Sequence, residues 1–426
     1  MKLLPKIYIT ALILTPLIPK IEVADVVAGH WVGLSLVTII GFLILLKNNI
    51  SIDFQFNKAI LPLLLFTGYL LVALISIFFA INYVESLITI TKVFLIFSNL
   101  YILYYLLRLN SFDDIKSYTL KIILILFIIE VLAVALPLFY LTDIFNHEFS
   151  NSLIYMKGLA GNKNIAAVSI AIKFPLVLYY IEISNNKSLR FILFLLLFLA
   201  SLMIVYSGTR TAYLIVFVFF AFTIYKFLKT LKNGLHYKKT LLNLLAPLLI
   251  ISSVIIYTNF SGKESRSSLQ NRVEFVNPNK IDNSGKQRIR FYKQALNYSF
   301  ENILMGAGIG NWKIISTYLD RENINSYVMP YNLHNDFLEV LGETGAFGFV
   351  FYTGFFISLF YLIYLLYKDK RLEDKSFVLV LAICLMGYII DAMLNFPQFR
   401  VLNQINLIIV YFLIVGTFNS IQNNKL

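Results

Sequence analysis

The sequence has a single cysteine and few charged residues for its length. The cysteine, Cys384, lies inside an apolar run, so a disulfide framework is excluded and a packing role is expected. Charged residues make up 14% of the 426 residues and apolar residues 59%, against roughly 25% and 45–50% in soluble domains. This composition excludes a soluble globular protein and predicts a polytopic membrane protein.

Internal repeats, Pro-rich or Gly/Ser-rich linkers and clustered metal ligands are also lacking. No second His or Cys stands at ligand spacing from His334, which disfavours a zinc site. The first twenty residues are basic and apolar, as in a signal peptide, but no small-residue cleavage pattern follows them. We therefore interpret this stretch as a retained first span, and we expect neither a metal nor a cofactor.

Twelve apolar runs approach the roughly 20 residues that a helix needs to cross the hydrocarbon core of a bilayer. An all-α integral membrane protein with about twelve transmembrane helices is therefore predicted, with both termini on one side. The runs lie near residues 5–22, 27–46, 59–80, 86–107, 119–141, 164–182, 189–207, 211–228, 240–258, 345–367, 376–394 and 401–419.

Lysine and arginine concentrate in alternate connections between these runs. A net charge of +13 would indicate nucleic-acid binding in a soluble protein, but here its distribution follows the positive-inside rule and we expect no nucleic acid. Both termini are predicted to be cytoplasmic. The long polar segment 259–344 is predicted to be a periplasmic loop between nine spans in 1–258 and three in 345–426.

Three stretches of this loop have apolar residues at helical spacing. QRIRFYKQALNYSF and NWKIISTYL are predicted to form short helices on the membrane surface. HNDFLEVLGETG is predicted to be a further helix, with Asn332 as a possible cap, that leads through Gly345 into the tenth span. The loop also gathers most of the groups that are able to do chemistry.

Three arginines on the outer side are candidates for binding an anion. Arg210 lies in SGTRTAYL, at the tight turn between the seventh and eighth spans, where it either snorkels to head groups or binds an anion. Arg288 and Arg290 lie in the first loop helix, and Tyr292 follows Arg288 by one turn on the same face. A guanidinium suits phosphate because its planar fork makes two charge-assisted hydrogen bonds.

His334 is the candidate base, because a neutral imidazole is able to take a proton from a hydroxyl during group transfer. A structural role at a helix start is the alternative. Asn335, Asp336 and Glu339 follow it, and either carboxylate would be placed to orient the ring. The sequence does not choose between the two.

Two further motifs carry weaker signals. Gly308 lies in GAGIG, which is a flexible turn or a set of backbone N–H groups for phosphate. Asn164 lies in LAGNKN, at the outer start of the sixth span, where it caps the helix or contacts a sugar. Charged residues inside spans are candidates too, with an ion pair between two of them as the alternative; these are Lys92, Glu130 and Lys173.

These motifs, in this order and on one side of the membrane, resemble the O-antigen ligase and polymerase superfamily of bacterial membrane glycosyltransferases. SGTRTAYL, QRIRFYKQAL, ILMGAGIGNW and NLHNDFLEVLGETGAFG carry the resemblance, and LAGNKNIAAV resembles an upstream segment of these proteins. The similarity extends over residues 158–348.

The resemblance implies a GT-C type enzyme of the bacterial inner membrane. It would take a glycan from an undecaprenyl diphosphate carrier and transfer it to an acceptor hydroxyl by a metal-independent, inverting displacement. The acceptor is a lipid A core sugar in ligases, the end of another glycan chain in polymerases and a protein Ser or Thr in O-oligosaccharyltransferases. Family roles map onto Arg210 and Arg288 for the diphosphate and onto His334 for the acceptor.

Two other classes of function remain open. A transporter or flippase for the lipid-linked glycan would have related halves and broken polar helices near the midplane, whereas the candidate groups here gather at one face. A non-catalytic assembly protein would need none of the three site residues. The transferase hypothesis requires Arg210, Arg288 and His334 to meet at the outer membrane surface.

Overall fold

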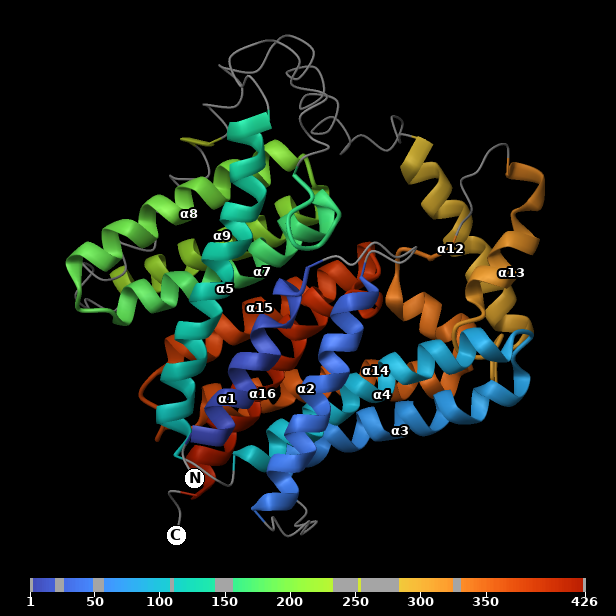
Figure 1. Ribbon diagram of the computed structural model, residues 1–426, viewed down its shortest axis with the longest axis horizontal. Helices are drawn as coiled ribbons and strands as arrows, with labels where there is room; N and C mark the ends of the chain where they lie inside the picture. Colours follow the sequence, from blue (N-terminus) through green and yellow to red (C-terminus); the bar gives the residue numbers. More distant parts are fainter. Residues whose placement is uncertain are drawn as a thin grey trace.

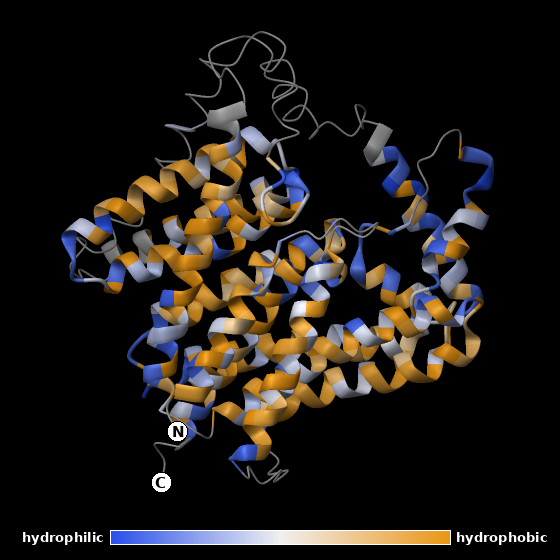
Figure 2. Cartoon of the chain, in the orientation of Figure 1, coloured by the Kyte–Doolittle hydropathy of each residue, from blue (hydrophilic) through white to orange (hydrophobic). Residues whose placement is uncertain are grey.

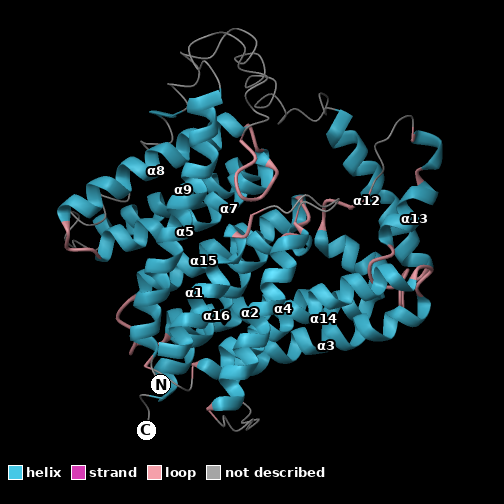
Figure 3. Ribbon diagram, viewed as in Figure 1, coloured by secondary structure: helices cyan, strands magenta, loops and turns pink. Residues whose placement is uncertain are grey.

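The computed structural model is a bundle of α-helices (Figure 1). It describes residues 3–19, 27–48, 57–107, 111–141, 156–232, 252–253, 283–324 and 331–423. Throughout these ranges the chain forms helices and turns and no β-strand (Figure 3). The predicted all-α fold class is thereby confirmed.

Thirteen α-helices make up most of the described residues. They are α1 (Leu3–Leu14), α2 (Ala28–Lys47), α3 (Leu61–Ser76), α4 (Tyr83–Leu106), α5 (Phe112–Leu141), α7 (Lys163–Ile183), α8 (Lys187–Ser207), α9 (Arg210–Lys232), α12 (Asn283–Glu301), α13 (Trp312–Leu319), α14 (Asp336–Lys368), α15 (Lys375–Leu394) and α16 (Val401–Asn423).

In the described part of the chain, nine helices are long and apolar enough to cross a membrane, and two shorter apolar helices cover residues 3–17 and 210–225. Eleven of the twelve predicted spans thus fall on helices, while the ninth, 240–258, lies outside the described residues. The first span is shorter than predicted. Its α-helix ends at Leu14, just before Pro16, because proline has no N–H to continue the hydrogen-bond ladder.

The core of the bundle lies around α16 and α7. In an apolar stretch of 18 residues taken from each helix, all residues of α16 and 89% of those of α7 are buried, against 39% for α8. A helix that is apolar on all sides is buried in this way, whereas apolar residues on the outer helices face lipid. In Figure 2 the helices of the bundle are mostly hydrophobic (orange), whereas α12 and α13 contain more hydrophilic residues (blue).

Contacts between connections group them into two ends of the bundle. At one end, Asn395 after α15 donates to the Thr211 hydroxyl at 3.2 Å, and Thr209 donates to Asn164 at 3.0 Å. At the other end, Asn57 before α3 donates to Asn419 of α16 at 3.1 Å. The sequence predicts that the first end is periplasmic and the second cytoplasmic, and each group contains only connections predicted to share a side.

The described part of the long polar segment packs on the start of α14. Two helices, α12 and α13, share a small core that includes Trp312 and Leu333. Gly345 bends α14 there with a φ of 67°, and the Ala346 N–H donates to the Ile303 carbonyl at 2.7 Å. A Cβ at Gly345 would lie 2.2 Å from the Leu304 carbonyl oxygen. Only glycine therefore permits this bend, which holds residues 336–344 against α12.

Candidate functional site

One face of α12 connects two of the predicted site residues. Arg288 Nη1 donates to the Leu394 carbonyl oxygen at 2.8 Å, and Tyr292, one turn further on, donates its hydroxyl to the His334 carbonyl at 3.1 Å. Burial raises the pKa of Tyr292, so the hydroxyl stays protonated as a donor. The predicted pairing of Arg288 and Tyr292 on one face therefore places an arginine beside the candidate base.

His334 has an unusual backbone conformation. Its φ of 58° is the only positive value at a non-glycine residue within the described ranges, and such a conformation costs about 1–3 kcal/mol. The ring packs edge-to-face on Phe396 with centroids 5.0 Å apart. Its Nδ1 is buried and makes no hydrogen bond to any described residue. A strained residue with an unsatisfied ring nitrogen is typical of a functional site.

Burial and the Arg288 charge lower the pKa of His334 to about 4. Both effects disfavour the imidazolium, since the charged ring would lose hydration and face another cation. At neutral pH the imidazole is therefore uncharged and able to accept a proton.

The two predicted carboxylates hold the backbone around His334 and not its ring. Glu339 accepts from the Leu333 N–H at 3.0 Å, and Asp336 accepts from the Gln398 N–H at 3.1 Å. Asn335 caps α14 by accepting from the Leu338 N–H at 3.1 Å. The cap is thus three residues later than the predicted Asn332. Together with Tyr292, these contacts fix the strained loop.

Arg210 begins α9, with its side chain exposed. Its two neighbours, Thr209 and Thr211, are buried and bonded to Asn164 and Asn395. The predicted Asn164 therefore lies beside the Arg210 turn through its side-chain oxygen, while Asn162 caps α7.

Residues 394–400 bring these groups together; they comprise the last residue of α15 and its connection to α16, and are here called the 394–400 connection. Leu394 accepts from Arg288, Asn395 donates to Thr211 beside Arg210, and Phe396 packs on His334. Three consecutive residues thus contact or adjoin the three predicted site residues. Sequence reasoning gave this connection no role, because its residues form no functional motif and its contacts are with residues far away in the chain.

Buried polar contacts hold the 394–400 connection in place. Asp391, 2% exposed, accepts from Asn395 at 2.7 Å and from Asn403 at 2.5 Å. Gln404 donates to the Pro397 carbonyl at 3.0 Å. Because these partners lie on α15 and α16 themselves, the connection is positioned by the helices of the bundle.

Arg290 forms an ion pair with Asp320 and does not share the contacts of Arg288. Its Nε and Nη2 each lie 2.8 Å from an oxygen of Asp320, whose side chain is 4% exposed, and Gln294 donates to Asp320 at 3.1 Å. This bidentate pair joins α12 to the end of α13. It gives Arg290 a structural role between the two helices.

The GAGIG turn packs closely on its surroundings. Gly308 has a φ of 82°, and a Cβ there would lie 2.6 Å from Ala80. Three N–H groups of the turn are bonded within the protein: Gly306 to the Asn302 carbonyl at 3.0 Å, Ala307 to the Gly342 carbonyl at 2.9 Å and Ile309 to the Ser76 hydroxyl at 3.1 Å. These contacts give the turn a packing role between α3 and α14.

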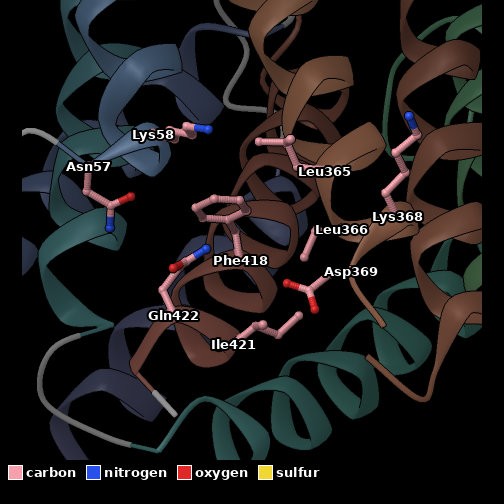
Figure 4. A pocket seen from close by; sticks show the side chains of 9 residues that line it. All are labelled: Asn57, Lys58, Leu365, Leu366, Lys368, Asp369, Phe418, Ile421 and Gln422. Atoms are coloured by element: carbon pink, nitrogen blue, oxygen red, sulfur yellow. The ribbon is translucent and has the colours of Figure 1, made fainter. Parts of the chain in front are cut away.

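Two cavities lie at opposite ends of α14. One of about 530 Å³, lined by Lys58, Lys368 and Phe418 among others, is near its carboxyl end and contains none of the predicted site residues (Figure 4). The other, of about 190 Å³, is near its amino end and is lined by Glu339 and Phe396. The smaller cavity therefore adjoins the candidate site, whereas Arg210, Arg288 and His334 do not line it.

The charged residues inside spans divide into two cases. Lys173 of α7 lies 2.7 Å from Glu130 of α5, and both side chains are at most 3% exposed. The ion-pair alternative thus describes their contact. Lys92 of α4 lines the smaller cavity, with its amine 5.5 Å from the centroid of the Trp31 ring.

Comparison with known proteins identifies the region around the site. Residues 195–353 match the family model described as O-antigen ligase, which confirms the resemblance over this part of the chain. The match includes Arg210, Arg288 and His334 and ends before the 394–400 connection. No curated protein matches the chain.

Proposed function

Because residues 195–353 belong to the O-antigen ligase family, we propose that this multi-pass membrane protein is a glycosyltransferase with a lipid-linked donor. The donor is a glycan on undecaprenyl diphosphate, and the acceptor is a sugar hydroxyl in surface polysaccharide assembly, with the site at the periplasmic face of the inner membrane. The observation that carries the proposal is the convergence of Arg288, the Arg210 turn and His334 on residues 394–396.

The arginines act on the leaving group. As the anomeric carbon–oxygen bond to the diphosphate breaks, negative charge develops on the departing oxygen. Guanidinium groups already placed there stabilise that charge in the transition state, and no metal ion is needed for it. Arg288 is held by the Leu394 carbonyl through one nitrogen, which leaves its remaining donors for phosphate oxygens.

His334 acts on the acceptor. The acceptor hydroxyl attacks the anomeric carbon from the side opposite the diphosphate, and its proton passes to the neutral imidazole. The carbon–oxygen bond to the acceptor forms as the bond to the diphosphate breaks, so the configuration inverts. The low pKa of His334 keeps the ring neutral before the reaction.

The test is transfer by the purified protein with chelator present. Undecaprenyl diphosphate glycan is supplied with lipid A core, a second lipid-linked glycan or a Ser/Thr peptide, and the acceptor that is glycosylated separates ligase from polymerase and protein transferase. Arg210→Lys and His334→Ala should abolish most transfer, because lysine lacks the planar fork and alanine lacks the base.

Arg190→Lys, at the start of α8, is the matched control and should retain activity. An active Arg210→Lys or His334→Ala protein would contradict the assigned roles. Retention of configuration would contradict the single displacement. Movement of labelled carrier across vesicles without any sugar transfer would instead identify a transporter.

A further inference from the structure

The cavity of about 190 Å³ beside Phe396, here called the Phe396 cavity, has no part in the chemistry described above. It is smaller than the roughly 300–1,000 Å³ of pockets for drug-sized ligands, so it suits one sugar residue and not an oligosaccharide. Its lining is strongly charged and includes Lys92, Lys313, Arg400, Glu339 and Glu343.

Phe396 is shared between this cavity and the candidate base. The His334 ring meets the Phe396 ring at 5.0 Å, and the guanidinium carbon of Arg400 lies 5.3 Å from the centroid of the same ring. Along the 394–400 connection, Leu394 and Asn395 contact the arginine-bearing helices, whereas Phe396 and Arg400 line the cavity. His334 therefore neighbours both the cavity, through Phe396, and the predicted diphosphate-binding Arg288, as expected if the cavity receives the acceptor.

The two glutamates of the cavity are fixed by the backbone. Glu339 accepts from the Leu333 N–H, and Glu343 accepts from the Trp312 N–H, both at 3.0 Å. Lys313 forms an ion pair with Glu85 and also faces both of these carboxylates. Carboxylates held in this way are suited to accept hydrogen bonds from sugar hydroxyls.

Two cations come from other elements of the fold. Lys92 lies nine residues after the start of α4, about 13 Å along the helix, and a charged side chain at such depth in a span usually faces a substrate path or cavity. Its amine lies near the Trp31 and Phe399 rings, 5.5 and 6.0 Å from their centroids. Arg400 approaches from the connection to α16. Lys92 and Arg400 therefore add positive charge to a cavity with aromatic walls.

We propose that the Phe396 cavity binds an acidic sugar residue of the acceptor and that Lys92 and Arg400 hold its anionic group. The rings of Phe396 and Phe399 would pack on the apolar face of the sugar. The sugar's acidic group is a carboxylate or a phosphate ester, which the same two cations suit. The identification of the bound sugar as part of the acceptor rests on the proposed function. Binding of an acidic sugar in the cavity does not, because binding does not require transfer.

The test measures binding of small glycosides to the purified full-length protein in nanodiscs by ligand-observed NMR. Methyl glucuronoside, methyl glucoside, glucose 6-phosphate and inorganic phosphate are the probes. We expect the glucuronoside or the sugar phosphate to bind about tenfold more tightly than the neutral glucoside, as expected for a charge-assisted contact. Whichever acidic sugar binds more tightly identifies the anionic group.

Lys92→Met and Arg400→Gln should each remove most of this preference while leaving binding of undecaprenyl diphosphate intact. Arg400 lies outside the helices, so its variant serves if Lys92→Met does not fold. Lys58→Met is the matched control, because Lys58 also lines a cavity and lies 5.9 Å from a tyrosine ring centroid, at the other end of the bundle.

Equal binding of neutral and acidic glycosides, no saturable binding of either acidic sugar, or an unchanged preference in both variants would overturn the proposal. Binding of inorganic phosphate as tight as that of the sugars would also overturn it, because a sugar site was inferred. Absence of transfer with intact acidic-sugar binding would count against the proposed function alone.

Discussion

The hydroxyl of Tyr292 donates a hydrogen bond to the carbonyl oxygen of His334 across 3.1 Å. One turn earlier on the same helix, Arg288 donates to the Leu394 carbonyl. A single face of α12 thus fixes the backbone of the candidate base and lays an arginine next to it. Because Tyr292 and Arg288 contact different groups, substituting each one separately distinguishes their roles.

Replacing Tyr292 with phenylalanine removes the donor and keeps the ring. The His334 carbonyl then loses a hydrogen bond that helps to hold the strained backbone conformation of this residue. We therefore expect turnover to fall about tenfold and the free energy of unfolding to fall by about 1 kcal/mol. Donor affinity should change little. Tyr298→Phe, which keeps the edge contact with Trp312, is the control. A Tyr292→Phe protein with unaltered turnover would show that the bond does not position His334.

Arg288 and Arg290 should respond differently to substitution. Arg288→Lys loses the planar fork that we propose contacts the departing diphosphate, and we expect turnover to fall about 10²–10³-fold, as on loss of a donor to a developing anion. Arg290→Ala instead leaves Asp320 buried without its partner, so it should lower thermal stability more than turnover. The double variant Arg290→Ala with Asp320→Asn should recover that stability. Equal losses of turnover for Arg288→Lys and Arg290→Ala would refute this division of roles.

The pKa of His334 provides a test that does not depend on activity. Burial and Arg288 both lower it, to about 4, so the neutral ring persists down to that pH and protonates only below it. Removing the neighbouring cation in Arg288→Gln should raise the pKa toward the usual 6.5. NMR titration of labelled histidine follows this directly, because the chain has four histidines and His334→Ala assigns the signal.

Binding of undecaprenyl diphosphate should raise the same pKa, because the diphosphate offsets the Arg288 charge. The acid limb of kcat should accordingly lie at higher pH than that of kcat/KM. A His334 signal that titrates near 6.5 in the wild-type protein, or that does not move in Arg288→Gln, would remove the electrostatic link between the two residues.

Local pattern was sufficient for most helices and insufficient for the site. Long apolar runs predicted α2 to α5 and α14 to α16 because burial in lipid depends on composition alone. The end of α1 was missed because Pro16 limits the α-helix within an apolar run. The cap of α14 was placed at Asn332 and not Asn335 because both are asparagines near the helix start, and only the backbone geometry distinguishes them.

The 394–400 connection could not have been found from its own residues. Its importance comes from contacts with Arg288, Thr211 and His334, which are about 60 to 185 residues away in the chain. Similarly, the spacing of Asp336 and Glu339 after His334 in the sequence suggests that either carboxylate is able to orient the ring. Their hydrogen bonds go instead to backbone N–H groups, one of which belongs to Gln398, 62 residues further along the chain.

The ion pair of Glu130 with Lys173 should matter for folding and not for transfer. Removing one partner alone, as in Lys173→Met, leaves a buried charge without compensation, which costs about 3–5 kcal/mol, whereas replacing both with apolar residues is often neutral or stabilising. We therefore expect Lys173→Met to lower the thermal unfolding temperature sharply. The double variant with Glu130→Leu should restore it and retain transfer activity. Lys173 also donates to the Ser169 hydroxyl, which accepts from Asn406 of the central helix α16, so the pair is linked to the core of the bundle. A double variant that is stable but does not transfer sugar would contradict this structural role and would assign the pair a part in the reaction.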